Sequence, residues 1–293
     1  MTGTRTLIKK ILLFFGIDPR KLYEKVGIWS IRRTIAQKGL YGLVERLREI
    51  VPDVSDQESS EKELFNTYWE LKRRSLQAFQ CSLMLNLLDT IHHGELTIVD
   101  IGDSAGTHML YLKELTKGKF SIDTISVNLD PRAIKKIEAR GLKAILCRAE
   151  DLDLGEKNID LITSFQMVEH LHNPAIFFRR LAKKARASRM LITVPYIKNS
   201  RVGLHQIRFG TRRDIFAEEE HIFELNPQDW TLILLHAGWK VVNSEIHFQY
   251  PRGWPLISQL LKYFWRSGDY EGFWGAVLEK DTTFSDYYLD WEE

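Results

Sequence analysis

A short apolar run that ends on a carboxylate and breaks into small residues occupies residues 96–106. The residues at its end are small or acidic: Asp100, Gly102, Asp103, Ser104, Ala105 and Gly106. This pattern predicts a strand, a tight turn and then a helix over residues 107–115. Glycine permits positive φ angles and close approach of a ligand, and the first N–H groups of a helix lack partners. The stretch therefore predicts a cradle for a nucleotide-type cofactor.

The charge of this turn favours one kind of cofactor. A dinucleotide-binding fingerprint needs glycine at position 104 and glycine or alanine at position 107, where the chain has Ser104 and Thr107. Asp100 and Asp103 would repel a pyrophosphate, whereas two carboxylates suit a ligand with positive charge. S-adenosylmethionine, with its sulfonium and ammonium groups, meets this requirement.

The turn resembles the first motif of the class I S-adenosylmethionine-dependent methyltransferases, Asp-x-Gly-x-Gly-x-Gly, with Ser104 at the middle glycine. The resemblance extends from residue 96 to about residue 280 and points to the small-molecule branch that includes ubiquinone-biosynthesis and sugar O-methyltransferases. It implies that the cofactor is S-adenosylmethionine. It also implies further cofactor contacts, namely Asn128 and Leu129 after the second strand, Ala149 and Glu150 for the adenine, and Phe165 and Gln166 for the methionine part.

Two of these positions depart from the family pattern. Asn128 stands where the family has an acidic residue for both ribose hydroxyls, and an amide offers a single acceptor oxygen. Asp130 is expected to cap the next helix and not to take the place of this acidic residue. Arg148 stands where the family has an adenine-binding aspartate, so that role passes to Ala149 and Glu150.

The residues on the acceptor side are fewer. His221 is predicted as the general base that removes a proton from a hydroxyl acceptor. The pair Glu169-His170 is either an acid–base couple or a stabiliser of the turn after the fourth strand. The acidic run 218–220 beside His221 is expected to be a solvated face, so no metal is predicted.

Alternating strand and helix patterns predict a Rossmann-like, doubly wound α/β fold with a seven-stranded, mostly parallel sheet whose last strand is antiparallel. The expected strands are 97–101, 124–129, 143–146, 159–164, 190–194, 239–247 and 273–278. Four caps that precede a proline, at residues 18, 130, 173 and 226, mark helix starts.

The domain organisation has two parts. Residues 1–60 are expected to be a basic, helical accessory region with an acidic linker at 51–60, and residues 61–293 the methyltransferase domain. Within this domain we expect a helical lead-in at 61–95, a core at 96–250 and 272–293, and a helical insertion at 251–271. The insertion has apolar residues at helical spacing, which indicates packing, with a lid over the acceptor as the alternative.

Composition and charge set the cellular context. Two cysteines without metal or disulfide spacing, and an apolar run at residues 11–17 that is too short to span a bilayer, predict a cytoplasmic protein. The net charge is +2, but residues 1–50 hold 11 basic and four acidic residues, a net +7 that leaves −5 for the rest. The basic, aliphatic helix expected at residues 7–15 suits either peripheral contact with the inner face of a membrane or packing on its own domain.

The resemblance implies methyl transfer to a small-molecule, glycan or lipid-linked acceptor, at oxygen, with cell-surface glycan biosynthesis as the preferred setting. A quinone or lipid O-methyltransferase is the first alternative. A non-catalytic methyltransferase-like module is the second, because Ser104, Asn128 and Arg148 depart from the cofactor pattern. Nucleic acid is not an expected partner, since residues 51–293 are acidic overall and lack an Asn/Asp-Pro-Pro-Tyr motif.

Overall fold

The computed structural model describes residues 13–55, 66–91, 94–208, 210, 214–215, 219–268 and 270–288. Most of the basic helix expected at residues 7–15, and residue 218 of the acidic run, lie outside these ranges. Parts of the helical lead-in expected at residues 61–95 also lie outside these ranges. Its described helix is α4, Thr67–Leu88, which Asn66 caps.

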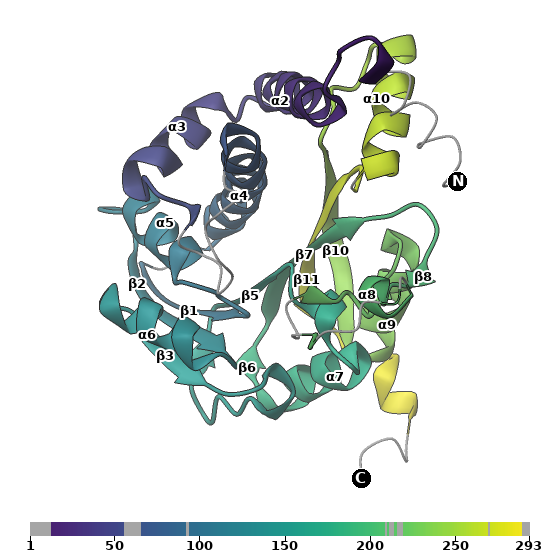
Figure 1. The fold of residues 1–293 in the computed structure, drawn as a ribbon. Helices are drawn as coiled ribbons and strands as arrows, with labels where there is room; N and C mark the ends of the chain where they lie inside the picture. Colours follow the sequence, from purple (N-terminus) through teal and green to yellow (C-terminus); the bar gives the residue numbers. More distant parts are fainter. Residues whose placement is uncertain are drawn as a thin grey trace.

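The core is one seven-stranded sheet in the order β10-β11-β7-β5-β1-β2-β3 (Figure 1). The strands are β1 Glu95–Ile101, β2 Ser121–Asn128, β3 Lys143–Leu146, β5 Leu161–Phe165, β7 Arg189–Tyr196, β10 Trp239–Phe248 and β11 Gly272–Lys280. β11 runs antiparallel to both of its neighbours, and the remaining neighbours pair in parallel. The predicted fold class, including the antiparallel last strand, is confirmed.

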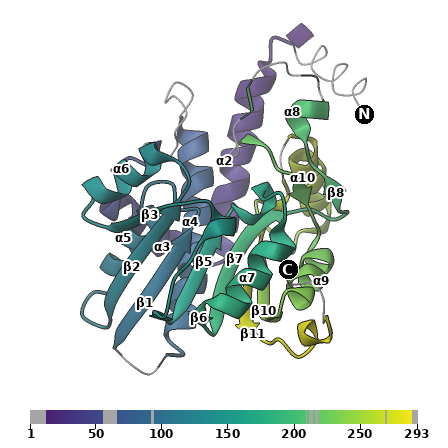
Figure 2. The same ribbon diagram turned by 90° about the horizontal axis from the view of Figure 1, so that it is seen from below.

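Helices cover both faces of the sheet. One face packs on α4, α5 Thr107–Leu115 and α6 Pro131–Ala139, and the other on α7 Pro174–Lys184 and α9 Pro227–His236. Figure 2 views the sheet from the side of α7, with α2 and α4 behind it. Successive strand residues point to opposite faces, so that Ile98 joins the first core cluster and Val99 the second. Because both faces are buried, the strands are continuously apolar.

Shorter elements complete the chain. They are η3 Ala149–Asp151, β4 Asn158–Ile159, η4 Val168–His170, β6 Arg186–Ala187, β8 Arg201–Val202, α8 His205–Arg208, β9 Phe223–Glu224 and η6 Ser285–Tyr287.

The predicted caps are confirmed. The side chains of Asp18, Asp130, Asn173 and Asn226 each accept a hydrogen bond from a backbone N–H in the first turn of α2, α6, α7 and α9. In each helix a proline follows directly, where its missing N–H costs nothing. These caps fix where each helix begins relative to the strand before it.

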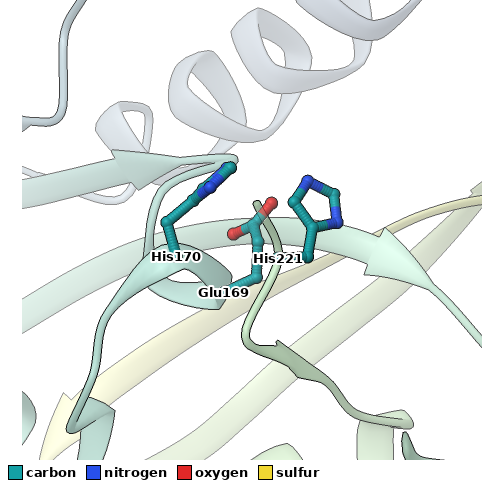
Figure 3. A group of neighbouring side chains, drawn as sticks. All are labelled: Glu169, His170 and His221. Carbon is teal, nitrogen blue, oxygen red and sulfur yellow. The ribbon is translucent and has the colours of Figure 1, made fainter. Parts of the chain in front are cut away.

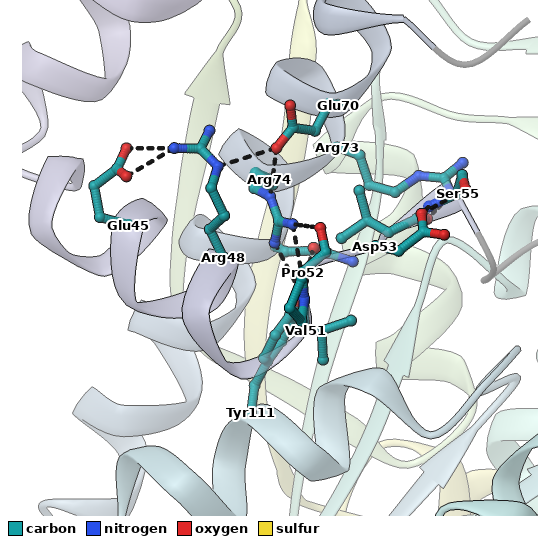
Figure 4. A network of polar contacts seen from close by, with 12 residues as sticks. Glu45, Arg48, Val51, Pro52, Asp53, Ser55, Glu70, Arg73, Arg74 and Tyr111 are labelled. Carbon is teal, nitrogen blue, oxygen red and sulfur yellow. Dashed lines mark hydrogen bonds and ion pairs between the residues drawn. The ribbon is translucent and has the colours of Figure 1, made fainter.

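The first helices pack against α4 and the core beneath it. α2, Pro19–Gln37, and α3, Tyr41–Ile50, contribute Ile31 and Leu47 to the same apolar cluster as α4. Arg74 of α4 is fully buried, and its Nη2 donates to the backbone oxygens of Val51 and Pro52, each at 2.8 Å (Figure 4). Removing this region would therefore expose apolar core.

The start of the predicted linker is anchored as well. Val51 and Val54 are buried, and the oxygen of Val54 accepts a hydrogen bond from Arg73 at 2.9 Å. The division of the chain at residue 60 stays a prediction, but residues 51–54 do not behave as a solvated linker.

The insertion between β10 and β11 holds α10, Pro255–Gly268. Leu261 and Trp265 are buried, and the indole of Trp265 donates to the Ser30 hydroxyl of α2 at 3.1 Å. Leu256 and Leu260, in contrast, are 82% and 71% exposed. The expectation that the apolar residues of this segment pack is thus correct for one face of the helix and wrong for the other. None of the helices in the described ranges is long and apolar enough to cross a membrane.

Candidate functional site

The glycine turn joins the end of β1 to the start of α5. Gly102 and Gly106 have φ angles of +93° and +72°, a region that favours glycine. A Cβ on Gly102 would stand 2.5 Å from Cγ of Met167, and one on Gly106 would stand 2.5 Å from Cδ1 of Leu142. Both positions require glycine, for backbone angle and for space.

Asp103 holds this turn together. Its Oδ1 accepts from the backbone N–H groups of Gly106 at 2.7 Å and Ala105 at 3.3 Å, and its Oδ2 accepts from the Ser126 hydroxyl at 2.8 Å. Burial raises the pKa of Asp103, and these hydrogen bonds oppose the rise. Ser104 is exposed at the tip of the turn, and Ala105 is buried. Because its carboxylate is occupied within the loop, Asp103 does not offer the charge to a ligand that the sequence suggested.

Asp100 remains available. Its Oδ1 accepts from the Thr163 hydroxyl at 2.9 Å, but its Oδ2 is buried with no hydrogen-bond partner among the described residues. Nδ1 of His108 lies 3.9 Å from that oxygen. Burial, and then the negative charge of Asp103, raise the pKa of Asp100 well above its usual range. A cationic group would supply the missing partner, so this position fits the ammonium of S-adenosylmethionine.

Asn128 links β2 to the turn. Its Nδ2 donates to the backbone oxygen of Asp103 at 3.0 Å, and its Oδ1 accepts from the N–H of Asp130 at 2.8 Å. One lone pair and one N–H remain for a ribose hydroxyl. The neighbouring Leu129 is 52% exposed. Asp130 caps α6, as expected, and does not replace the missing carboxylate.

In the loop predicted to bind the adenine, a basic and an acidic side chain lie close together. Ala149 and Glu150 begin η3, and Oε1 of Glu150 lies 3.7 Å from Nη2 of Arg148. The backbone oxygen of Glu150 accepts from Arg180 at 2.6 Å. Arg148, the departure from the family pattern, therefore faces the very carboxylate to which the adenine contact was assigned.

Phe165 and Gln166 lie at the carboxyl end of β5, beside β1. Parallel sheets bind ligands at this edge, where the strand order reverses. Phe165 packs against the imidazole of His108, with ring centroids 4.7 Å apart. Burial lowers the pKa of His108 to about 4. Gln166 has a φ of +54°, and its side chain donates to the Thr193 hydroxyl at 3.2 Å. A strained non-glycine backbone at a strand end is typical of ligand sites.

A second group of polar side chains follows directly. Glu169 and His170 of η4 meet His221, and the ligand-type atoms of the three residues lie within 4.8 Å of one another (Figure 3). The loop of His221 is fastened to η4, because the N–H of Ile222 donates to the oxygen of Glu169 at 2.9 Å. Since Met167 covers Gly102 and η4 begins at the next residue, this group lies beside the glycine turn.

Electrostatics differ within the group. Burial raises the pKa of Glu169 to about 7, although the charge of His221 opposes this. Burial alone would lower the pKa of His221, but its hydrogen bond with Glu224 and the charge of Glu169 raise it overall. Burial would likewise raise the pKa of Glu224, yet hydrogen bonds from His221, Arg201 and Tyr270 lower it to about 2. His221 therefore sits among carboxylates that favour its protonated form.

Sequence reasoning ranked His221 above Glu169 and His170, and the structure places all three together. His108, Glu224 and Tyr270 were missed. Tyr270 comes from the segment before β11, 49 positions from His221, and its hydroxyl oxygen lies 2.8 Å from Nδ1 of His221. No local pattern could have paired residues so far apart.

Comparison with known proteins agrees with this geometry. The sequence model of a family described as "Methyltransferase domain" matches residues 50–244. Two probable S-adenosylmethionine-dependent methyltransferases of Mycobacterium tuberculosis, from strains CDC 1551 and H37Rv, are each 29% identical over 131 residues. The match spans 44% of this chain and 44% of those relatives, which is less than half of their length.

Among solved structures, a proposed sarcosine dimethylglycine methyltransferase of Galdieria sulphuraria superimposes with a TM-score of 0.50 and 13% identity. The superposition covers 72% of this chain and 87% of that one, and it shows likeness of fold alone. The family match confirms the predicted class of enzyme and its cofactor, S-adenosylmethionine. The chain belongs to the methyltransferase domain family.

Proposed function

We propose that this chain transfers a methyl group from S-adenosylmethionine to a hydroxyl of a small-molecule or carbohydrate acceptor. The observation that carries the proposal is Asp100, a buried carboxylate with one oxygen that has no partner in the described ranges, at a glycine turn that lies beside His221. A cation-accepting cradle and a titratable group at the same sheet edge are what methyl transfer from a sulfonium requires.

The roles on the cofactor side follow from the contacts. Asp100 accepts a hydrogen bond from the ammonium. The backbone of the turn 102–106 lies directly against the cofactor. Asn128 and Leu129 meet the ribose, Ala149 and Glu150 the adenine, and Phe165 and Gln166 the methionine chain. S-adenosylmethionine itself supplies the electrophilic methyl group.

The acceptor side centres on His221. During transfer, a bond forms between the acceptor oxygen and the methyl carbon, the bond from that carbon to sulfur breaks, and the hydroxyl proton passes to Nε2 of His221, the general base of this proposal. Nδ1 of His221 is held by Tyr270, which leaves Nε2 to act on the acceptor hydroxyl. Activation of this hydroxyl is the role that we assign to His221, which stays a prediction.

The preferred setting is glycan assembly near the inner face of a membrane, with residues 1–50 in peripheral contact with anionic lipid. The net charge of +7 in that region supports this setting. A quinone or lipid hydroxyl is compatible with the same contact. For either acceptor we propose that the segment 251–271 acts as a lid, and the exposed apolar side chains of Leu256 and Leu260 in α10 support this role.

A non-catalytic binding module is the second candidate. Two observations support it. Asn128 already uses one N–H donor and one oxygen lone pair in hydrogen bonds within the protein, and Arg148 faces Glu150. Both features weaken the cofactor contacts that the family pattern provides.

Calorimetric titration with S-adenosylmethionine and S-adenosylhomocysteine distinguishes the two candidates. We expect saturable binding by the parent chain and none by the double variant Asp100→Ala, Gly102→Val. Ser104→Gly restores the family motif at an exposed position and serves as the matched control that keeps or improves affinity. Absence of binding by the parent would favour the module, whereas binding would justify screening glycan, quinone and lipid acceptors.

A further inference from the structure

The group Glu169, His170 and His221 contains an unexplained carboxylate. Glu169 is 1% exposed, and neither of its carboxylate oxygens has a hydrogen-bond partner in the part of the chain that the structure describes. Figure 3 shows this carboxylate between the two imidazole rings, whose centroids are 4.6 Å apart and whose planes are perpendicular. A buried carboxylate without partners is costly unless a charge compensates it.

In both histidines, a hydrogen bond at Nδ1 fixes the orientation of the ring. Nδ1 of His170 lies 3.0 Å from the backbone oxygen of Glu220, which can only accept, so Nδ1 is the protonated nitrogen. Nδ1 of His221 lies 2.8 Å from the Tyr270 hydroxyl, which itself donates to Glu224. His221 must then donate from Nδ1 as well. In the neutral form of each ring, Nε2 carries the lone pair.

This is the arrangement by which proteins prepare histidines for metal binding. A ligating imidazole donates its other N–H to a carbonyl or to a carboxylate, which fixes the tautomer and strengthens the ligand. His170 has the carbonyl of Glu220, and His221 has the relay through Tyr270 to Glu224.

A plain ion pair between Glu169 and a protonated histidine explains the site less well. Such a pair is stabilised in the interior only when the carboxylate also receives hydrogen bonds, and Glu169 receives none from the described residues. The other group with metal-ligand spacing, Asp100, Asp103 and His108, is a poorer candidate, because Asp103 is already saturated by its own loop.

We propose that Glu169, His170 and His221 bind a divalent transition-metal ion such as Zn²⁺ or Co²⁺. Two imidazole nitrogens and one carboxylate are a common ligand set for such ions and leave coordination positions open. Ligands at about 2.1 Å from a metal stand at most about 4.2 Å apart, so the three atoms, within 4.8 Å of one another, need little movement to close on an ion. No metal is predicted from the sequence, because the acidic run 218–220 beside His221 is expected to be a solvated face, and Glu169 and His170 lie 52 and 51 positions before His221 in the sequence.

The site deepens the proposed function and rests on it for its role in catalysis. The partial exposure of His170 and His221 opens the group toward solvent on one side, where an acceptor hydroxyl can enter as a further ligand. A bound cation lowers the pKa of such a hydroxyl, and the proton passes to solvent. His221 is then a ligand of the cation. It activates the acceptor hydroxyl through the cation and does not itself take the proton.

Metal binding is measurable without any acceptor. We would strip the full-length chain with chelator, titrate it with Co²⁺ while recording visible absorption, and titrate it with Zn²⁺ by calorimetry. One equivalent of ion per chain is expected, with the d–d bands of a low-symmetry site. No binding at micromolar concentrations, or binding of several equivalents without saturation, would overturn the assignment.

Variants locate the ion. Glu169→Gln keeps the shape of the side chain and should weaken binding at least tenfold, and His221→Ala should abolish the absorption bands. Tyr270→Phe, which removes only the partner of Nδ1, should weaken binding about 10- to 100-fold. The matched control is His172→Ala, an exposed histidine two residues from His170, which should bind as the parent does. Equal affinity in parent and Glu169→Gln would refute the site.

Titration with S-adenosylhomocysteine in the same samples separates the two proposals. It also reports folding, because Glu169→Gln should bind the nucleoside as the parent does. Metal binding without nucleoside binding would leave the metal site standing and sink the proposed function. Nucleoside binding without metal binding would do the reverse.

Discussion

Asp100→Asn should have opposite effects on stability and on cofactor binding. Oδ2 of Asp100 is buried without a partner among the residues that the structure describes, and the charge of Asp103 adds to the penalty for ionising it. Asparagine removes the charge and keeps an acceptor for the Thr163 hydroxyl. The same change removes the negative charge that we assign to the ammonium of S-adenosylmethionine.

The size of the first effect follows from the unpartnered oxygen. A buried acceptor without a partner costs about 1–3 kcal/mol, and more when it carries a charge. Asparagine removes the charge but leaves an unsatisfied N–H group there, which costs about 1 kcal/mol. We therefore expect a net gain of about 1 kcal/mol at pH 8, or about 2–4 °C in Tm.

The pH dependence gives the sign. Because the folded pKa is raised, the stability of the parent is intact below the unfolded pKa of 3.8 and is lost as the pH rises through the folded pKa. The advantage of Asp100→Asn should grow from nearly zero at pH 4 to its maximum above neutrality.

Thermal unfolding from pH 4 to 8 and calorimetry with S-adenosylhomocysteine measure the two effects. We expect about 10- to 100-fold weaker nucleoside binding, the value of a charged hydrogen bond. Asp103→Ala is the contrasting variant, because it strands the N–H of Gly106 and the Ser126 hydroxyl and should destabilise the chain by about 2–4 kcal/mol. A lower Tm for Asp100→Asn at every pH would show that the reasoning about the unpartnered oxygen is wrong.

Three further outcomes are expected. Gly102→Ala should abolish nucleoside binding while circular dichroism stays native, and adding Met167→Gly should restore part of the affinity, because Cγ and Cβ of Met167 would lie 2.5 Å and 2.7 Å from the new methyl group. His247, buried with a pKa lowered to about 3, contributes stability that is present above pH 6.5 and lost as the pH falls, so His247→Phe should flatten the decline in urea-unfolding free energy between pH 6 and 4. If residues 1–50 contact anionic lipid, the full chain should sediment with vesicles that contain phosphatidylserine and the variant Lys9→Glu, Lys10→Glu should not, whereas equal sedimentation would exclude this contact.

The fold was predictable because its signals are local. Strands buried on both faces are continuous apolar runs, and a capping residue before proline marks a helix start wherever it occurs. β2 begins three residues before the predicted strand, and β7 ends two residues after its predicted end, because the ends of elements depend on packing that the sequence alone does not show.

The site was predictable only where it is contiguous. The turn 102–106 lies in one stretch, and its glycines occupy the positive-φ positions expected of them. The partners of a side chain are not a local property, so two carboxylates three residues apart looked equivalent, although Asp103 is hydrogen-bonded within its own loop and Asp100 leaves one buried oxygen without a partner among the described residues. The pairing of Glu169 with His221 needed the loop that β9 and η4 hold in place.

The bonds within the glycine turn have a thermodynamic consequence for binding. Asp103 holds the loop through Gly106, and Gly102 donates its N–H to the oxygen of Val127 at 2.8 Å, so the protein's own groups fix this turn. A loop that is already ordered loses little conformational entropy when it receives a ligand. Association with the nucleoside should therefore be fast and nearly independent of loop rearrangement, and differences in affinity among relatives with this aspartate should arise in the dissociation rate.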